Sequence, residues 1–292
     1  MSADWVEIAS DRLRAAINPF GAELSSLRDA DDRELMTDAD PAFWSGRAPL
    51  LFPIVGRLMD DKYRLDGAEY PLPQHGFARR QPFALTGQAA DRAVFRLADN
   101  AETRAVYPFA FTLDAAYTLD GATLATDITV TNTGDRDMPA SFGFHPALAW
   151  PLPFGRPRED HRLVFEKDEP AELSAITKGG WIAPEGWPSP LDGRVLTLDD
   201  ALFERDALVW DSLESKSLRY DGGDGPGLDI GFAGMPKLGI WTKPGAHFVC
   251  IEPWHGVADR QGFAREIWDK PGMLRFAPGQ ARTFSMQVTL DA

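Results

Sequence analysis

The chain has 292 residues, of which 44% are hydrophobic and 25% charged, the composition of a soluble globular protein with a large core. Its 44 acidic residues outnumber its 30 basic residues and give a formal net charge of −14. We therefore expect neither nucleic acid nor an anionic membrane as a partner, because phosphate groups would be repelled on average.

Short runs in which apolar and polar residues alternate predict a series of β-strands. Between these runs lie 26 glycines and 23 prolines, which favour turns and interrupt long helices. We expect a flexible turn at 222–227 and a loop over the site at 151–158. The pattern predicts an all-β fold, a sandwich or barrel, formed as one domain over residues 1–292. The clearest strand signals lie at 94–97, 111–119, 124–131, 163–166, 228–232, 238–242 and 282–290.

The most informative single residue is Glu252, which follows the apolar run 248–251 and precedes Pro253. Carboxylates are almost never fully buried without a partner, so a glutamate at the end of a buried strand calls for an explanation. One explanation is that the strand ends there and Glu252 reaches solvent, since proline cannot continue a β-ladder. The other is that Glu252 is a catalytic acid or base.

Two histidines lie in settings that suit a ligand site. His75 precedes Gly76, whose missing side chain allows close approach of a ligand to the backbone. His145 ends the segment Ser141 to His145, where alternation places it on one face with Ser141 and Gly143. These small neighbours leave room beside the imidazole, although a lone histidine on such a strand can equally be structural.

Other chemistries find no support in the sequence. The five histidines and the single cysteine, Cys250, show no metal-ligand spacing, so we predict no metal and no cofactor. No G-x-S-x-G elbow indicates a serine hydrolase. Cys250 lies in apolar surroundings and is expected to be a reduced core thiol. No secretory signal or membrane span is visible, and we expect a cytoplasmic protein.

Several motifs, in this order and spread over most of the chain, resemble the aldose 1-epimerase (galactose mutarotase-like) family, and most closely its LacX-like branch. They are the segments 18–24, 49–57, 75–79 (His-Gly-Phe-Ala-Arg), 143–146 (Gly-Phe-His-Pro), 238–241 and 250–254 (Cys-Ile-Glu-Pro-Trp). The resemblance implies a large β-sandwich of the galactose mutarotase, or supersandwich, type. It also implies a sugar as the small-molecule partner.

The resemblance also implies roles for individual residues. Glu252 would be the base at the C1 hydroxyl of an aldose, and His145 the acid at the ring oxygen. His75 would bind sugar hydroxyls. General acid and general base working across one sugar would open the hemiacetal and interconvert its anomers.

Further positions are less specific. Asp206 is the nearest match to the family's hydroxyl-binding aspartate, although a surface turn would explain it as well. Arg57 and Arg79 resemble pocket positions, where a guanidinium can hold hydroxyls or a phosphate, but either could instead pair with an acidic side chain. Trp254, like Trp44 and Trp241, could present an aromatic face to the sugar or pack in the core. The motifs at His75 and Glu252 depart from the His-Gly-Gly and Glu-Pro-Gln forms of the better-known mutarotases, so galactose is not indicated as the substrate.

Three functions therefore stay open. The first is an aldose 1-epimerase acting on a hexose or related aldose. The second is a hexose-phosphate mutarotase in which Arg57 and Arg79 hold the phosphate, with Arg80 as a further candidate. The third is a carbohydrate-binding protein without catalytic activity.

Overall fold

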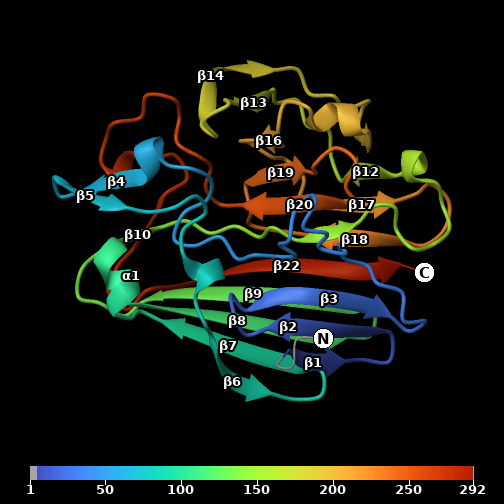
Figure 1. Cartoon of the computed structure of the whole chain (residues 1–292), viewed down its shortest axis with the longest axis horizontal. Helices are drawn as coiled ribbons and strands as arrows, with labels where there is room; N and C mark the ends of the chain where they lie inside the picture. Colours follow the sequence, from blue (N-terminus) through green and yellow to red (C-terminus); the bar gives the residue numbers. More distant parts are fainter. Residues whose placement is uncertain (1–4, 292) are drawn as a thin grey trace.

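The computed structural model describes residues 5–291, and β-strands account for nearly all of its regular structure. Every paired strand in this part of the chain runs antiparallel to its partner. The largest sheet has nine strands in the spatial order β15-β12-β17-β18-β22-β9-β8-β7-β6 (Figure 1). Their bounds are Val195–Thr197, Arg162–Phe165, Ser217–Asp221, Gly227–Gly231, Ala281–Asp291, Thr123–Asn132, Phe111–Asp120, Arg92–Ala98 and Ala84–Gln88. The all-β prediction is confirmed.

Two smaller sheets lie against this large sheet (Figure 1). The three-stranded sheet β1-β2-β3 comprises Val6–Ala9, Leu13–Asn18 and Glu23–Asp29 and packs near β7 and β8. The four-stranded sheet β11-β20-β19-β16 comprises Ala147–Ala149, Phe248–Trp254, Lys237–Trp241 and Leu208–Trp210. Three two-stranded ladders complete the fold: β4 (Lys62–Leu65) with β5 (Ala68–Pro71), β10 (Met138–Ala140) with β21 (Leu274–Phe276), and β13 (Leu173–Ile176) with β14 (Ile182–Trp187).

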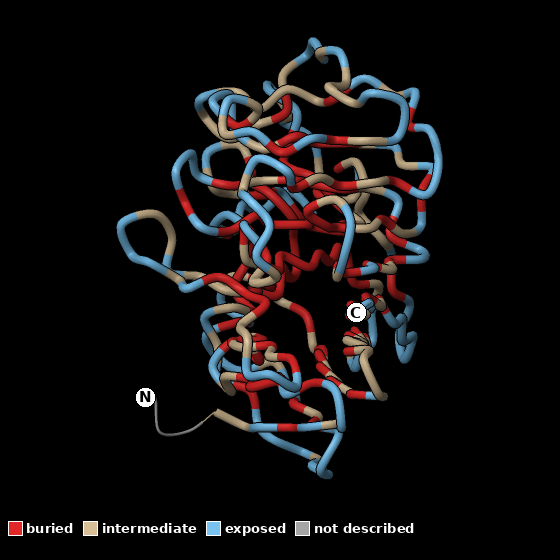
Figure 2. The backbone as a smooth tube through the Cα atoms, turned by 90° about the vertical axis from the view of Figure 1, so that its right-hand side faces the viewer, coloured by how far each residue is buried: buried red, intermediate tan, exposed pale blue. Residues whose placement is uncertain are grey.

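The core lies between the sheets, where Figure 2 shows the buried segments gathered along the middle of the molecule. Strand β8 illustrates how the sequence produces it. Its residues alternate strictly between buried and half-buried, so that Phe111, Leu113 and Tyr117 face inward. The Tyr117 hydroxyl donates a hydrogen bond of 2.6 Å to the carbonyl of Ala22, which ties the N-terminal sheet to the large one.

The strand predictions at 111–119, 124–131 and 282–290 correspond to β8, β9 and β22, and the predicted turn at 222–227 joins β17 to β18. One α-helix, α1 (Ala101–Val106), was not predicted. It begins with a capping box, in which the Asn100 side chain accepts from the Thr103 amide and the Thr103 hydroxyl accepts from the Asn100 amide. Its six residues are too few for an amphipathic period to be visible in the sequence. No helix in residues 5–291 is long and apolar enough to cross a membrane.

Candidate active site

A cavity of about 370 Å³ opens beside β20 and contains the polar residues singled out from the sequence. One part of its wall is polar and consists of Gln74, His75, Arg79, His145, Asp206 and Glu252. Another part is aliphatic and consists of Ile176, Ile182, Ala207, Val209, Val257 and Ala258. Trp44, Trp241 and Trp254 add aromatic surface. Apolar walls with a few convergent polar groups are typical of small-molecule sites.

Glu252 lies on β20, which is buried along its whole length because it pairs on both sides, with β11 and with β19. In the register Glu252 faces Gly239 of β19, and the indole of Trp254 covers that glycine so closely that a Cβ there would lie 2.4 Å from the ring. Glu252 is therefore only 1% exposed. The alternative in which the strand carries this carboxylate into solvent does not hold.

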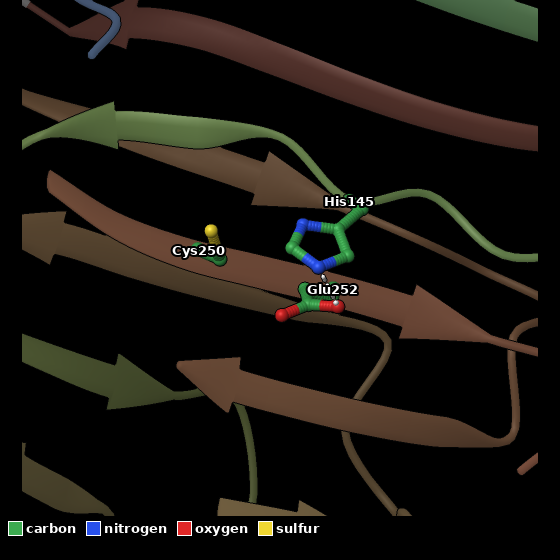
Figure 3. A group of neighbouring side chains, drawn as sticks. All are labelled: His145, Cys250 and Glu252. Atoms are coloured by element: carbon green, nitrogen blue, oxygen red, sulfur yellow. Dashed lines mark ion pairs between the residues drawn. The ribbon is translucent and has the colours of Figure 1, made fainter. Parts of the chain in front are cut away.

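His145 reaches the same point from a different segment. The residues before it are pinned to the neighbouring chain: Gly143 bridges Leu51, and the Phe144 amide donates to the Pro253 carbonyl at 3.0 Å. Its Nε2 lies 3.1 Å from Oε2 of Glu252, an ion-pair distance (Figure 3). The approach does not have hydrogen-bond geometry, so Glu252 Oε2 has no hydrogen bond to any described residue. The other ring nitrogen of His145, Nδ1, also has no hydrogen-bond partner among these residues.

The pKa values of this pair move in opposite directions. Burial raises the pKa of Glu252 well above its ordinary value, and the negative charge of Asp206 adds to the effect. The indole N–H of Trp254 favours the ionised carboxylate and so partly offsets this rise in the Glu252 pKa, although it stays outside hydrogen-bond geometry. Burial lowers the pKa of His145 to about 3, and the positive charge of Arg79 contributes to the lowering. Between these two pKa values the pair therefore holds one proton, which resides on Glu252 and leaves the imidazole of His145 neutral.

His75 stands beside His145, with 5.8 Å between the ring centroids and the two rings nearly perpendicular. Its Nδ1 accepts a hydrogen bond of 3.1 Å from the Gly56 amide, which requires the proton of the neutral imidazole to be on Nε2. The Gln74 amide faces that Nε2 at 3.3 Å and, to accept from it, must present its oxygen. Burial and the nearby charge of His145 lower the pKa of His75 well below its ordinary value. His75 is thus a neutral hydrogen-bond donor.

The backbone at His75 is unusual, because the residue has φ +64°, in the left-handed region that costs a non-glycine residue free energy. Gly76 follows with φ +69°, and a Cβ on it would lie 2.2 Å from the Phe52 carbonyl oxygen. The glycine therefore permits close contact with the protein's own backbone, whereas the sequence suggested close contact with a ligand. The tight packing fixes the strained turn that carries His75.

The remaining predicted residues separate into two groups. Arg79, Asp206 and Trp254 line the cavity. Asp206 is exposed at φ +88° and accepts a hydrogen bond from the Ala207 amide. Arg57 does not line the cavity: its guanidinium forms a two-pronged ion pair with Asp61, with both N–O distances 2.8 Å. The i,i+4 carboxylate is therefore the partner of Arg57, one of the two outcomes considered from the sequence.

Sequence reasoning missed the hairpin β13-β14, which contributes Ile176, Gly180 and Ile182 to the wall. Pro184 and three glycines, Gly179, Gly180 and Gly186, obscure the strand pattern. The loop 151–158, expected over the site, contributes no residue to the cavity. Arg158 holds that loop elsewhere, stacked 3.5 Å from the centroid of Trp150.

A third side chain, Cys250, lies next to the pair, and donor atoms of Cys250, His145 and Glu252 all fall within 4.8 Å of one another (Figure 3). Three such donors are a conceivable soft-metal set. However, burial raises the pKa of the Cys250 thiol well above its ordinary value, whereas a metal requires the thiolate, and Cys250 does not line the cavity. The arrangement fits a protonated core thiol behind an acid–base pair.

The nearly all-β fold and a buried carboxylate–imidazole pair in a cavity define a protein of the galactose mutarotase-like class. Comparison with known proteins agrees. The sequence pattern of the family described as aldose 1-epimerase matches residues 4–218, and the chain belongs to this family. It is 31% identical to the plasmid-encoded protein LacX of Lactococcus lactis subsp. lactis over 98% of this chain and 99% of that protein.

Two solved structures are similar over nearly their whole length. A galactose mutarotase related enzyme from Lactobacillus acidophilus superposes with a TM-score of 0.91 at 31% identity, covering 99% of this chain and 98% of that one. A galactose mutarotase-like protein from Lactobacillus casei gives a TM-score of 0.91 at 29% identity, covering 99% and 100%. The predicted supersandwich type of fold is confirmed.

Proposed function

We propose that this protein is an aldose 1-epimerase that interconverts the α and β anomers of a free aldose. The observation that supports the proposal most strongly is the 3.1 Å approach of His145 Nε2 to Glu252 Oε2 in the wall of a sugar-sized cavity. General acid–base catalysis needs two groups whose environments push their pKa values apart, both within reach of the reacting atoms.

The proposed reaction uses the two protonation states of the pair in turn. At rest the proton of the pair lies on Glu252, and the reaction starts from the minor form in which His145 carries that proton. In this form Glu252 takes the proton of the C1 hydroxyl while His145 gives its proton to the ring oxygen, and the C1–O5 bond breaks. The open-chain aldehyde then leaves Glu252 protonated and His145 neutral. After rotation about the C1–C2 bond, O5 attacks the other face of C1 and both protons return.

His75 supports this reaction as a donor that cannot take part as an acid. Its Nδ1 is engaged by the Gly56 amide, so Nε2–H is available to a sugar oxygen. Because burial holds the ring neutral, it adds no second positive charge beside His145. Asp206 at the edge of the cavity can accept hydrogen bonds from sugar hydroxyls.

A specific observation favours a second candidate, a hexose-phosphate mutarotase. The guanidinium of Arg79 lines the cavity, is half-buried, and has no carboxylate within 4.0 Å in the described residues. Its one hydrogen bond, of 3.1 Å, goes to the Gln74 carbonyl. Burial, with the charge of Arg80, lowers the Arg79 pKa to about 10. The carboxylate of Glu23 is near enough to favour the charged form but makes no ion-pair contact, so the guanidinium remains available to an anionic substituent.

The deciding experiment measures anomer exchange by NMR for a panel of neutral aldoses and sugar phosphates, at equal enzyme concentration. Acceleration of neutral aldoses supports the first proposal, and acceleration confined to phosphorylated sugars supports the second. Binding of sugars without acceleration of any of them would favour the third reading, a carbohydrate-binding protein. We also propose that the reaction takes place in the cytoplasm.

A further inference from the structure

The imidazole of His145 is held in an unusual way. Catalytic histidines are commonly oriented by a hydrogen bond from the nitrogen that does not act on the substrate. Here Nε2 faces Glu252, and the buried Nδ1 has no hydrogen-bond partner among the described residues. Its own carbonyl oxygen lies near enough to raise the pKa slightly, but outside hydrogen-bond geometry. Another contact must fix the plane of the ring.

An aromatic wall provides that contact. The centroid of the Trp44 ring lies 5.0 Å from that of His145, and the two rings are tilted by 32° relative to each other, so that His145 lies nearer to the face of Trp44 than to the face of Trp241. Trp241 meets His145 with its ring tilted by 75° at 6.0 Å. Both tryptophans are half-buried and line the cavity.

Trp44 is itself held firmly in place. Trp241 meets it edge-on at 5.6 Å, and Phe248 packs against it at 5.7 Å. Its amide donates a 2.9 Å hydrogen bond to the Asp40 carbonyl. Gly46 lies directly against the indole, so that a Cβ at that position would be 2.3 Å from Cζ2. The site therefore has room for the indole in this pose only because residue 46 is a glycine.

We propose that Trp44 is the positioning residue of His145: its π face fixes the plane of the imidazole and stabilises the cationic form that protonates the ring oxygen. The inference rests on the proposed function, since it takes His145 to be the acid. The face of an aromatic ring carries partial negative charge and attracts a cation, most strongly where water is excluded. His145 is 8% exposed, so little water is present to screen the contact.

The first test compares Trp44→Phe, which keeps an aromatic face, with Trp44→Leu, which fills space without one. We expect Trp44→Phe to stay within about threefold of the parent, and Trp44→Leu to lose about tenfold in kcat with KM nearly unchanged. The alkaline limb of its pH profile should move about one unit toward lower pH, the size expected for a desolvated cation–π contact. Trp268→Leu is the matched control: this half-buried tryptophan stacks 4.1 Å from the Arg275 guanidinium, away from the cavity, and its loss should move neither kcat nor the limb.

A second variant leaves the indole in the protein and displaces it. Gly46→Ala forces the Trp44 ring from its present pose, so we expect the same shift of the alkaline limb as in Trp44→Leu. If Trp44→Leu raises KM and leaves the limb where it was, Trp44 acts as a stacking surface for the sugar and the proposal fails. An equal loss of kcat in Trp44→Phe and Trp44→Leu would also overturn the proposal, because the aromatic face of phenylalanine should preserve most of the activity.

A third measurement is independent of activity and separates failure of this inference from failure of the proposed function. The ¹⁵N chemical shifts of the His145 ring report the protonation state of the imidazole, including whether Nε2 carries a proton. We expect His145 to become protonated only at a lower pH in Trp44→Leu than in the parent, with Trp44→Phe between them. An unchanged His145 titration in Trp44→Leu refutes the role of Trp44 whether or not the protein proves to be an epimerase.

Discussion

Glu252→Gln is the most informative perturbation of this protein, because it removes a base and keeps the shape of the side chain. A positioned general base typically supplies a factor of ~10² to 10⁴, which corresponds to roughly 3–5 kcal/mol of barrier. With Glu252 only 1% exposed, solvent has little access to replace it. We therefore expect the loss to fall in the upper half of that range, about 10³-fold or more.

The rate is followed by polarimetry of a freshly dissolved pure anomer and by exchange NMR at equilibrium, while calorimetry measures sugar binding. Binding should change much less than the rate, since the glutamine still offers hydrogen bonds to the C1 hydroxyl. Glu169→Gln is the matched control: Glu169 is also buried, at 6% exposed, but it accepts hydrogen bonds from the Glu214 and Ser215 amides away from the cavity. Exchange at the parental rate in Glu252→Gln would show that this carboxylate is not the base.

The same variant has a pH signature in stability. Burial raises the Glu252 pKa in the folded protein above the ordinary value of 4.5. The contribution of Glu252 to the free energy of unfolding is therefore fully present below about pH 4.5. It is lost as the pH rises through the raised pKa, since the glutamate of the unfolded chain ionises first. Glutamine does not ionise, so the melting temperature of Glu252→Gln relative to the parent should increase as the pH rises from 4.5. Parallel melting curves across this window would contradict the burial argument.

Two further outcomes concern charged side chains near the site. Arg79→Ala should weaken binding of a sugar phosphate at least tenfold more than binding of the neutral sugar, measured by calorimetry, whereas Arg57→Ala should not discriminate between them; equal effects on both ligands would remove the support for the phosphate candidate. Lys270→Met should cost about 3–5 kcal/mol of unfolding free energy, measured by denaturant titration, because it strands the buried carboxylate of Asp259, now 2.7 Å from the Lys270 ammonium. Lys62→Met, which breaks an exposed ion pair, should cost less than about 1 kcal/mol, and a similar cost for both lysines would refute the argument.

Local patterns were sufficient to predict strands but not to pair them. The alternation in 124–131 and 282–290 predicted β9 and β22 nearly to their ends, because one face of each is buried and the other is not. That these two strands are neighbours is a non-local fact: Thr129 pairs with Thr283 across 154 residues. Nothing in either segment encodes that choice by itself, since many alternating segments could satisfy the same backbone hydrogen bonds.

The site shows the same division. The apolar run before Glu252 left open whether its side chain is buried or reaches solvent, and the family resemblance pointed to Glu252, His145 and His75. Their distances follow from sheet pairing and from a strained turn that the sequence did not reveal. The position of Arg57 could not be predicted, because a long guanidinium side chain has several reachable partners and a nearby aspartate supplied one. The hairpin β13-β14 contributes only apolar residues and a glycine to the cavity wall, so no catalytic motif in the sequence indicated it.

The close approach of Glu252 and His145 has a consequence for where protons come from. In the proposed reaction, one ring opening followed by one ring closure returns the pair to the protonation state in which it began. One proton passes from the sugar to Glu252 and back, and the other passes from His145 to the sugar and back. No exchange with bulk water is then required during turnover, so the cycle is closed with respect to solvent. His145 Nε2 and Glu252 Oε2 are only 3.1 Å apart, so a small rotation of either side chain into hydrogen-bond geometry would let the proton pass between them and reset either state. An enzyme built in this way would turn over at a rate independent of buffer concentration, and sugar hydroxyls would take the place that water chains occupy in other acid–base sites.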